Sequence, residues 1–179
     1  MTNYRRNRVP GASYFFTVAL ADRSTDLLTR YIDLLRAATA QTKQQLPFTI
    51  DAVVILPEHL HCIWTLPPGD SDYSTRWKKI KSAFSRAITT SPNEPISASK
   101  AVKGERGIWQ RRFWEHTLRG DEDYAHHIDY IHFNPVKHGL VKRVSEWPHS
   151  SFHRYVRDGD YPAGWGGTAA ELPYESGET

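Results

Sequence analysis

Apolar residues alternate with polar ones in some parts of the chain and recur every three or four residues in others. Alternation is typical of a strand with one buried face, whereas the longer period is typical of an amphipathic helix. Within 27–45 the apolar residues share one helical face: Leu27, Leu28, Tyr31, Leu34, Leu35 and Ala38. In chain order, the pattern predicts a strand at 14–20, a helix at 27–45, strands at 48–56 and 59–66, a helix from Ser74 or Thr75 to about 89, a strand at 108–118, a helix at about 122–134 and a short helical segment at 135–140.

The order of these elements predicts the fold class. Strand, helix, strand, strand, helix, strand is the order of a ferredoxin-like α+β fold, in which helices cover one face of an antiparallel sheet. RNA-recognition modules share this RRM-like order and bind single-stranded nucleic acid on the open sheet face. The helix near 122–134 follows the complete unit, so we expect it to be a C-terminal addition. This added helix bears Tyr130.

The chain is expected to form one domain with an appended tail. At 179 residues it is long enough to bury a hydrophobic core. Residues 158–179 contain five acidic residues, no Lys or Arg, and several Gly and Pro residues. We therefore expect the domain to span residues 1–157 and a flexible acidic tail to span residues 158–179.

Composition indicates a soluble protein of a reducing compartment. No stretch of the sequence is apolar and long enough to cross a membrane, so we expect no membrane partner. Cys62 is the single cysteine, which excludes an internal disulfide and suits the cytoplasm.

Positive charge is concentrated in the middle of the chain. The net charge is only +3, yet residues 72–119 carry eleven Lys and Arg against four Asp and Glu. A basic region interleaved with aromatic residues is typical of a nucleic-acid binder, because cations contact phosphates and aromatic rings stack on bases. A solvated charged surface is the alternative interpretation.

Two histidines in one predicted strand form the first candidate site. His59 and His61 are two residues apart, so their side chains lie on the same face of the strand. Two imidazoles on a rigid strand make half of a divalent-metal site. The alternative is a pair of histidines stacked on a half-exposed sheet face.

Tyr130 and Asn134 form the second candidate element. They are four residues apart and therefore share a helical face. A tyrosine beside a metal suggests a nucleophile that attacks phosphorus, and an amide oxygen suits Mg²⁺ or Mn²⁺. The alternatives are a core tyrosine, and an asparagine that caps a new helix beginning at Pro135.

Several motifs, in this order, carry a resemblance to a known family. They are YRR at 4–6 with Pro10-Gly11, LPEHLH at 56–61, WQRRFWEH at 109–116, YIHFNPVKHGLV at 130–141 and WPHSS at 147–151. Over residues 4–155 the chain resembles the single-tyrosine HUH transposases, and within them the REP-associated tyrosine transposases. One position departs from the family pattern, since Glu58 stands where Asn is usual.

The resemblance implies a metal-dependent endonuclease and strand transferase acting on single-stranded DNA. His59, His61 and Asn134 would hold one divalent metal, Mg²⁺ or Mn²⁺. Tyr130 would attack a DNA phosphate, form a 5′-phosphotyrosine bond and leave a 3′-hydroxyl. The expected partner is hairpin DNA of the REP/BIME type at the bacterial nucleoid. We expect a monomer, with a homodimer as the alternative.

Eight cations and one aromatic residue are expected to contact DNA. They are Arg5, Arg6, Arg8, Lys78, Lys79, Lys81, Arg111 and Arg112, with Trp109, or else Trp114, stacking on a base. His116, His126 and His132 are possible proton carriers.

Two other functions stay open at this point. One is a non-catalytic binder of nucleic-acid hairpins on the same fold. The other is a zinc hydrolase with a third histidine, although the sequence has neither a second cysteine nor a HExxH helix.

Overall fold

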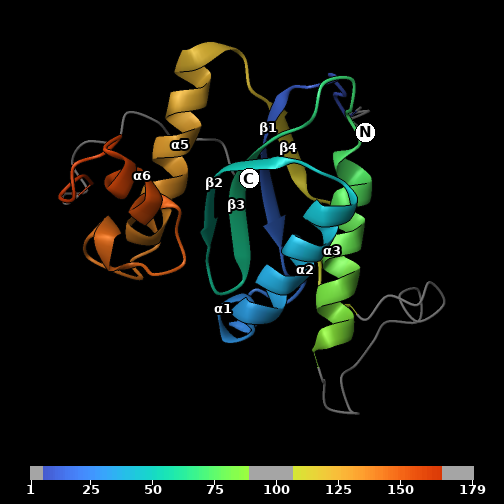
Figure 1. Cartoon of the computed structure of the whole chain (residues 1–179). Helices are drawn as coiled ribbons and strands as arrows, with labels where there is room; N and C mark the ends of the chain where they lie inside the picture. The colour runs from blue at the N-terminus through green and yellow to red at the C-terminus, as the bar shows by residue number, and fades with distance from the viewer. Residues whose placement is uncertain (1–5, 89–106, 167–179) are drawn as a thin grey trace, which may run out of the picture.

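The computed structural model describes residues 6–88 and 107–166, in an alternation of strands and helices (Figure 1). The elements are β1 (Ser13–Ala19), α1 (Leu27–Arg30), α2 (Ile32–Gln45), β2 (Thr49–Ile55), β3 (His59–Thr65), α3 (Tyr73–Ala87), β4 (Trp114–Thr117), α5 (Gly120–Lys137), the 3₁₀ turn η1 (Val144–Glu146) and α6 (Phe152–Asp158). None of the helices in these two ranges is long and apolar enough to cross a membrane.

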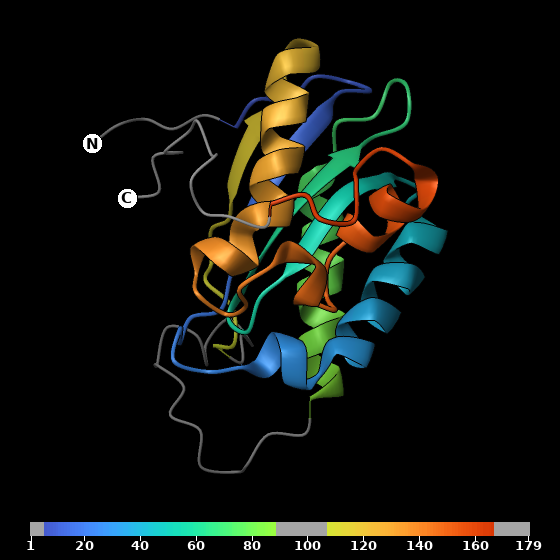
Figure 2. The same ribbon diagram turned by 90° about the vertical axis from the view of Figure 1, so that its left-hand side faces the viewer.

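The strands form one antiparallel sheet in the order β2-β3-β1-β4. Helices α2 and α3 pack together on one side of this sheet, and α5 lies on the other (Figures 1 and 2). The predicted α+β, ferredoxin-like sheet with an added tyrosine-bearing helix is therefore confirmed.

Side-chain alternation assigns each strand residue to one of the two faces. On the α2 and α3 side, Phe16 and Trp64 pack with Trp77 of α3. On the α5 side, Phe15 and Ile63 belong to a second cluster of buried apolar residues, together with Ile128 and others. Because side chains alternate, the odd-numbered residues of β3, including both histidines, face α5.

Two predicted helices have different boundaries in the structure. The helix expected at 27–45 is interrupted at Tyr31, which separates α1 from α2. The next helix, α3, begins at Tyr73, earlier than expected. Asp72 is its N-cap, because the Asp72 side chain accepts a hydrogen bond of 3.0 Å from the backbone N–H of Thr75.

The segments predicted at 122–134 and 135–140 are one continuous helix, α5, which passes through Pro135. The proline has no backbone N–H, so the helix lacks the hydrogen bond that this position would otherwise donate. Asn134 is thus inside a helix and is not the N-cap of a new one.

The strand predicted at 108–118 is mostly absent. Only Trp114–Thr117 pairs with β1, and Trp109 makes an isolated bridge with Leu20. Trp109 instead turns into the core, where it packs on Phe84 of α3.

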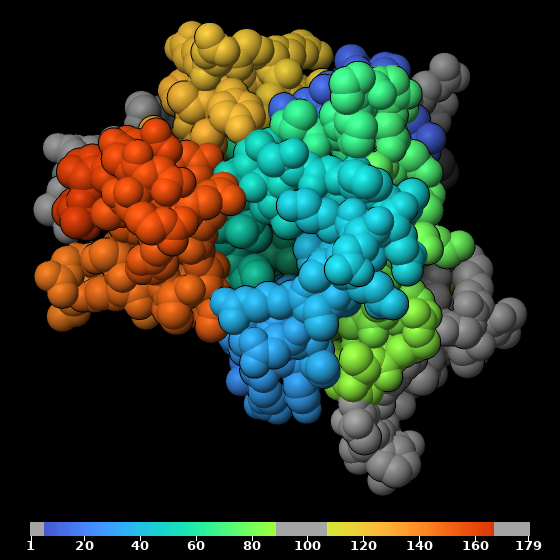
Figure 3. All heavy atoms as spheres, viewed as in Figure 1, coloured from blue at the N-terminus to red at the C-terminus, as the bar shows by residue number. Residues whose placement is uncertain are grey.

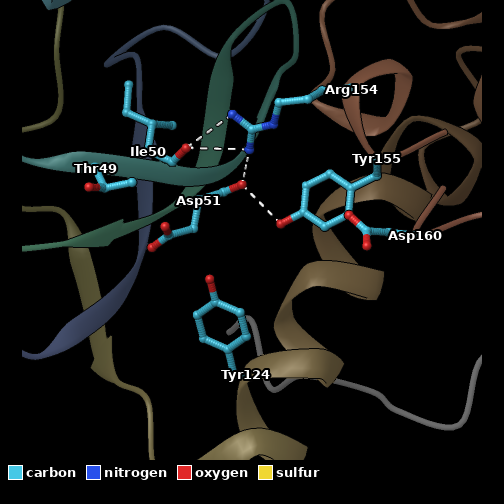
Figure 4. A pocket seen from close by; sticks show the side chains of 7 residues that line it. All are labelled: Thr49, Ile50, Asp51, Tyr124, Arg154, Tyr155 and Asp160. Carbon is cyan, nitrogen blue, oxygen red and sulfur yellow. Dashed lines mark hydrogen bonds between the residues drawn. The ribbon is translucent and has the colours of Figure 1, made fainter. Parts of the chain in front are cut away.

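The C-terminal segment packs on the β2 edge of the sheet, which the sequence pattern did not predict. The backbone N–H of Ser151 donates to the carbonyl of Val53 over 2.8 Å. Arg154 and Tyr155 of α6 donate to backbone carbonyls at the start of β2, including that of Asp51 (Figure 4). This segment protects an edge that would otherwise expose unpaired backbone groups.

The expected tail begins in packed structure. Tyr161 and Trp165 contact each other and Phe152 of α6. The chain therefore stays in contact with the domain as far as Gly166, and residues 167–179 lie outside the described part.

Candidate active site

The candidate site lies between β3 and α5. His59 and His61 are buried, with exposed fractions of 2% and 0%, and their rings meet edge to face with centroids 4.9 Å apart. Both side chains point from the sheet toward α5, because they occupy alternate positions of one strand. The two imidazoles are thus adjacent, as their spacing predicts.

Each imidazole is oriented by a polar neighbour at Nδ1. For His59 this neighbour is the carboxylate of Glu58, 2.9 Å away, to which the ring N–H donates. For His61 it is the hydroxyl of Thr17, also at 2.9 Å. Nε2 is therefore the ring atom that would meet a metal, and Nε2 of His59 is buried without a hydrogen-bond partner among the described residues.

Burial determines the charge of the two rings. Desolvation lowers the pKa of His59, although the adjacent Glu58 opposes the shift, and it lowers the pKa of His61 well below the usual value. Both imidazoles are consequently neutral at pH 7. A neutral imidazole keeps the lone pair with which it binds a metal.

Asn134 comes to this site from α5. His61 contacts Tyr130 with ring centroids 5.2 Å apart, and His59 contacts His138 at 5.1 Å. Asn134 is four residues from Tyr130 and four from His138, the C-cap of α5, so it lies between them on the same helix face. The helix therefore lies against the histidine pair along the length that carries Asn134.

The Asn134 side chain provides a test of whether the residues fit a metal. It is fully buried, and neither its oxygen nor its nitrogen has a hydrogen-bond partner within the described residues. A buried amide without partners is costly and uncommon. A divalent cation bound by its oxygen would remove part of this cost, so the donor set of two imidazoles and one amide fits such an ion.

Tyr130 is partly buried beside the pair of histidines. Its ring contacts His61, and it also contacts Phe15, with the Tyr130 and Phe15 centroids 5.9 Å apart. The ammonium of Lys137 donates to the tyrosine hydroxyl over 3.4 Å and lies 4.7 Å from the ring centroid. A phenol oxygen beside a cation and a candidate metal site has the surroundings that a nucleophile requires.

Comparison with known proteins identifies the family. The REP-associated tyrosine transposase of Escherichia coli (strain K12) is 48% identical over 172 residues, which cover 96% of this chain and 95% of the relative. The chain belongs to the REP-associated tyrosine transposases. A relative from Haemophilus influenzae, named as a candidate member of the same family, is 46% identical over 93% of this chain and 94% of its own.

A solved structure supports the same assignment to the REP-associated tyrosine transposases. It describes a member of the family bound to a REP hairpin, at 47% identity and a TM-score of 0.82. The similarity covers 100% of this chain and 98% of the other. No protein-family model matches the chain.

The expected DNA-binding cations of this transposase are spread over the surface. Arg8, Lys78, Lys79, Arg111 and Arg112 are exposed, whereas Arg5 lies outside the described residues. Hydrogen bonds to other parts of the protein hold three of the cations. Arg6 donates to Ser74, Lys79 donates to Gln45, and Lys81 donates to the carbonyl of Gln110. The three lysines belong to α3, across the sheet from Tyr130.

The two candidate stacking residues differ in exposure. Trp109 is only 8% exposed and belongs to the core, so its ring is not accessible to a base. Trp114 is 48% exposed, and its ring meets Phe15 edge-on at 5.6 Å. Since Phe15 also contacts Tyr130, Trp114 is the tryptophan that lies close to the candidate site.

The possible proton carriers have different surroundings. His126 is exposed, and His116 contacts the Asp123 carboxylate. His132 is fully buried and contacts the Ser151 hydroxyl at 2.9 Å.

A hollow of about 450 Å³ lies on the opposite side of the sheet, between α2 and the C-terminal segment (Figure 3). Its walls include Leu60, Cys62 and Trp64, the even-numbered residues of β3. It is mostly apolar and contains neither His59 nor Tyr130, so it is separate from the candidate site.

Proposed function

We propose that this chain is a metal-dependent endonuclease and strand transferase of single-stranded hairpin DNA, with Tyr130 as nucleophile. The observation that carries the proposal is a set of buried ligand atoms beside that tyrosine. These atoms are Nε2 of His59 and the side-chain amide of Asn134, which lack hydrogen-bond partners within the described residues. His59, His61 and Asn134 would hold one Mg²⁺ or Mn²⁺ ion.

The proposed chemistry is a transesterification. The bound cation would supply charge stabilisation at the phosphoryl oxygens. The Tyr130 phenol loses its proton to water and its oxygen attacks phosphorus, so a tyrosyl O–P bond forms while the P–O3′ bond of the DNA breaks. The leaving 3′-oxygen takes up a proton, and the 5′-phosphate stays on the tyrosine. Attack by a 3′-hydroxyl on this phosphotyrosine reverses the step and joins strands without an external energy source.

Lys137 has a role in the same proposal. Its ammonium is within reach of the phenol oxygen, so it favours the negative charge that Tyr130 carries when it attacks. Lys137 touches the reacting atom and is in this sense a catalytic residue of the proposal.

Hairpin DNA of the REP/BIME type is the proposed substrate, because a solved relative is bound to a REP hairpin. The proposed contacts are phosphate contacts by the eight cations expected from the sequence and stacking by Trp114. The set comprises Arg5, Arg6, Arg8, Lys78, Lys79, Lys81, Arg111 and Arg112. Binding through these groups would weaken with salt.

The same proposal specifies a cellular location and an oligomeric state. Acting on genomic hairpins, the chain would work in the bacterial cytoplasm, at the nucleoid. The histidine pair and Tyr130 come from one chain, so we propose that a monomer is sufficient.

A non-catalytic hairpin binder is the competing function. It explains the sheet and the basic surface, but it gives no reason to bury an unpartnered amide beside a tyrosine. A zinc hydrolase with His138 as third ligand has less support. Among the described residues, His59, His61 and His138 do not form a cluster with ligand atoms within 4.8 Å of one another.

The decisive experiment is detection of the covalent intermediate. Labelled single-stranded hairpin DNA is incubated with the protein and Mg²⁺ or Mn²⁺, and the products are separated on a denaturing gel. We expect a protein–DNA adduct that Tyr130→Phe abolishes while hairpin binding remains. Tyr124→Phe is the matched control, because this tyrosine lies on the same helix. Tight binding without adduct or cleavage, across metals and hairpin sequences, would favour the non-catalytic binder.

A further inference from the structure

A second group of metal-ligating side chains lies away from the histidine pair of β3. It consists of His116 on β4 with Asp123 and His127 on α5. One ligand atom from each lies within 4.8 Å of the others, and no other group of three such side chains occurs in the described residues. We call this group the β4–α5 cluster.

The Asp123 carboxylate is at the centre of the β4–α5 cluster. One of its oxygens lies 2.8 Å from Nε2 of His116, and the other lies 3.0 Å from Nδ1 of His127. The backbone N–H of Arg119 also donates to the carboxylate over 2.8 Å and fixes its orientation. Ring nitrogen atoms from two different elements therefore approach the same carboxylate.

Stacking holds both imidazoles in place. The rings of His116 and His127 lie nearly parallel, with centroids 5.0 Å apart and an angle of 17°. His116 also stacks on Trp114 at 5.9 Å, and His127 packs on Phe15 at 4.7 Å. Rings held in this way lose little further freedom when they bind an ion.

We propose that the β4–α5 cluster is a second cation site, selective for Zn²⁺ or a similar first-row transition metal. The ligands are Nε2 of His116, Nδ1 of His127 and one oxygen of Asp123. Two imidazoles and a carboxylate are a common zinc donor set, whereas Mg²⁺ prefers oxygen ligands and retains water. Zinc bonds of about 2.0–2.2 Å bridge ligand atoms up to roughly 4 Å apart, so small side-chain shifts close the site.

The imidazoles of the β4–α5 cluster can exchange their hydrogen bonds to Asp123 for bonds to a metal. Without the ion, the ring nitrogen atoms that face Asp123 can donate to its oxygens, and Nδ1 of His127 also lies 2.8 Å from the backbone carbonyl of Asp123. When a metal binds, each proton moves to the other ring nitrogen, so a neutral ring stays neutral. The side chains are 32%, 25% and 18% exposed in the order His116, Asp123, His127, which leaves access for the ion and for a water ligand.

A cation bound by the β4–α5 cluster would link α5, which carries Tyr130, to strand β4 of the sheet. His127 precedes Tyr130 by three residues, so the two share a face of α5. Phe15 contacts both rings, at 4.7 and 5.9 Å. The ion would act through these packing contacts as a positioning element, and it would not touch the DNA phosphate.

The test separates this site from the proposed active site. Zinc binding is measured by calorimetry on untagged protein in which His59→Ala and His61→Ala remove the other imidazoles. We expect about one equivalent of Zn²⁺ to remain bound, and excess Mg²⁺ should not displace it. Addition of Co²⁺ should give visible absorption bands. Adding His116→Gln, or separately Asp123→Asn, should abolish the binding, whereas His126→Gln, an exposed histidine of the same helix, should preserve it.

Thermal unfolding provides an independent readout. Zn²⁺ should raise the melting temperature of the His59→Ala, His61→Ala protein and should have no such effect once Asp123→Asn is added. Absence of zinc binding in the double variant would overturn the proposal. Equal zinc binding with and without His116→Gln would overturn it as well. Neither result bears on adduct formation by Tyr130, which is measured separately.

Discussion

The carboxylate of Glu58 lies 2.9 Å from Nδ1 of His59. It also pairs with Arg23, whose guanidinium is 3.3 Å away. Burial alone would raise the pKa of Glu58, but the neighbouring His59 and Arg23 outweigh it and lower the pKa, so the group is ionised at pH 7. An anion thus orients a proposed metal ligand.

Replacement of this anion should weaken the metal site. We expect Glu58→Gln to lower Mn²⁺ affinity by about 10-fold to 100-fold, because a carboxylate behind a ligating imidazole fixes the ring and raises its basicity. Calorimetry measures the affinity, and adduct formation should recover at high Mn²⁺. Glu122→Gln, at an exposed position of α5, is the control. Unchanged affinity would mean that Glu58 is a surface turn residue.

Removal of the cation beside the nucleophile should slow its attack. We expect Lys137→Met to reduce the rate of adduct formation at pH 7 by at least about 10-fold, since a positive charge at the reacting oxygen is lost. Part of the loss should be recovered at higher pH, where more phenolate forms. Single-turnover gels measure the rate, with the exposed Lys142→Met as control. Equal rates for both variants would remove Lys137 from the mechanism.

The two tryptophans should differ in their effects on binding and stability. Trp114→Ala should cost about 1–3 kcal/mol of hairpin affinity, the usual value for one stacked base, and leave unfolding nearly unchanged. Trp109→Ala should instead lower the free energy of unfolding by about 3–5 kcal/mol, because it empties part of the core. Fluorescence anisotropy and urea titration measure the two quantities. Full hairpin affinity in Trp114→Ala would show that no base stacks there.

Burial of His132 should make stability depend on pH. Desolvation lowers the pKa of this side chain to about 3, from 6.5. Between these values the unfolded chain binds the additional proton. The free energy of unfolding should therefore fall as pH falls below 6.5, by up to about 1.4 kcal/mol per pH unit.

His132→Gln isolates this dependence. Urea unfolding in EDTA at several pH values between 4.5 and 8 is compared for the two proteins. The buried His59 and His61 contribute equally to both, so the difference reports His132. A constant difference over the whole range would contradict the assignment.

The parts of the fold that depend on strand periodicity were predictable from sequence. Alternation alone places His59 and His61 on one face of β3, and the helical period places Tyr130 and Asn134 on one face of α5. The sequence does not give the register between strands, so Thr17, which is directly opposite His61, could not be recognised as its partner.

Tertiary contacts override local pattern elsewhere. The aromatic residues of 108–118 favour a strand, but Trp109 is held in the core beside α3. Helix α6 has seven residues and buries little beyond Phe152, so it leaves almost no periodic pattern. The sequence could have indicated Lys137 as a neighbour of Tyr130, because the two residues are seven positions, or two helical turns, apart.

The family pattern and the structure give different information about function. The similarity to curated relatives covers nearly the whole chain, yet only the structure brings His116 near α5. Contacts between separate elements are not encoded in the spacing of any one motif.

Helix α5 places Tyr130 beside the histidine pair of its own chain. If these groups perform strand transfer as proposed, each molecule has one nucleophile and can hold one severed DNA end at a time. Joining two ends then requires either two successive turnovers or two copies that meet on the same DNA. The initial cleavage rate per molecule should be independent of protein concentration, while the yield of joined product reports which of the two routes is used.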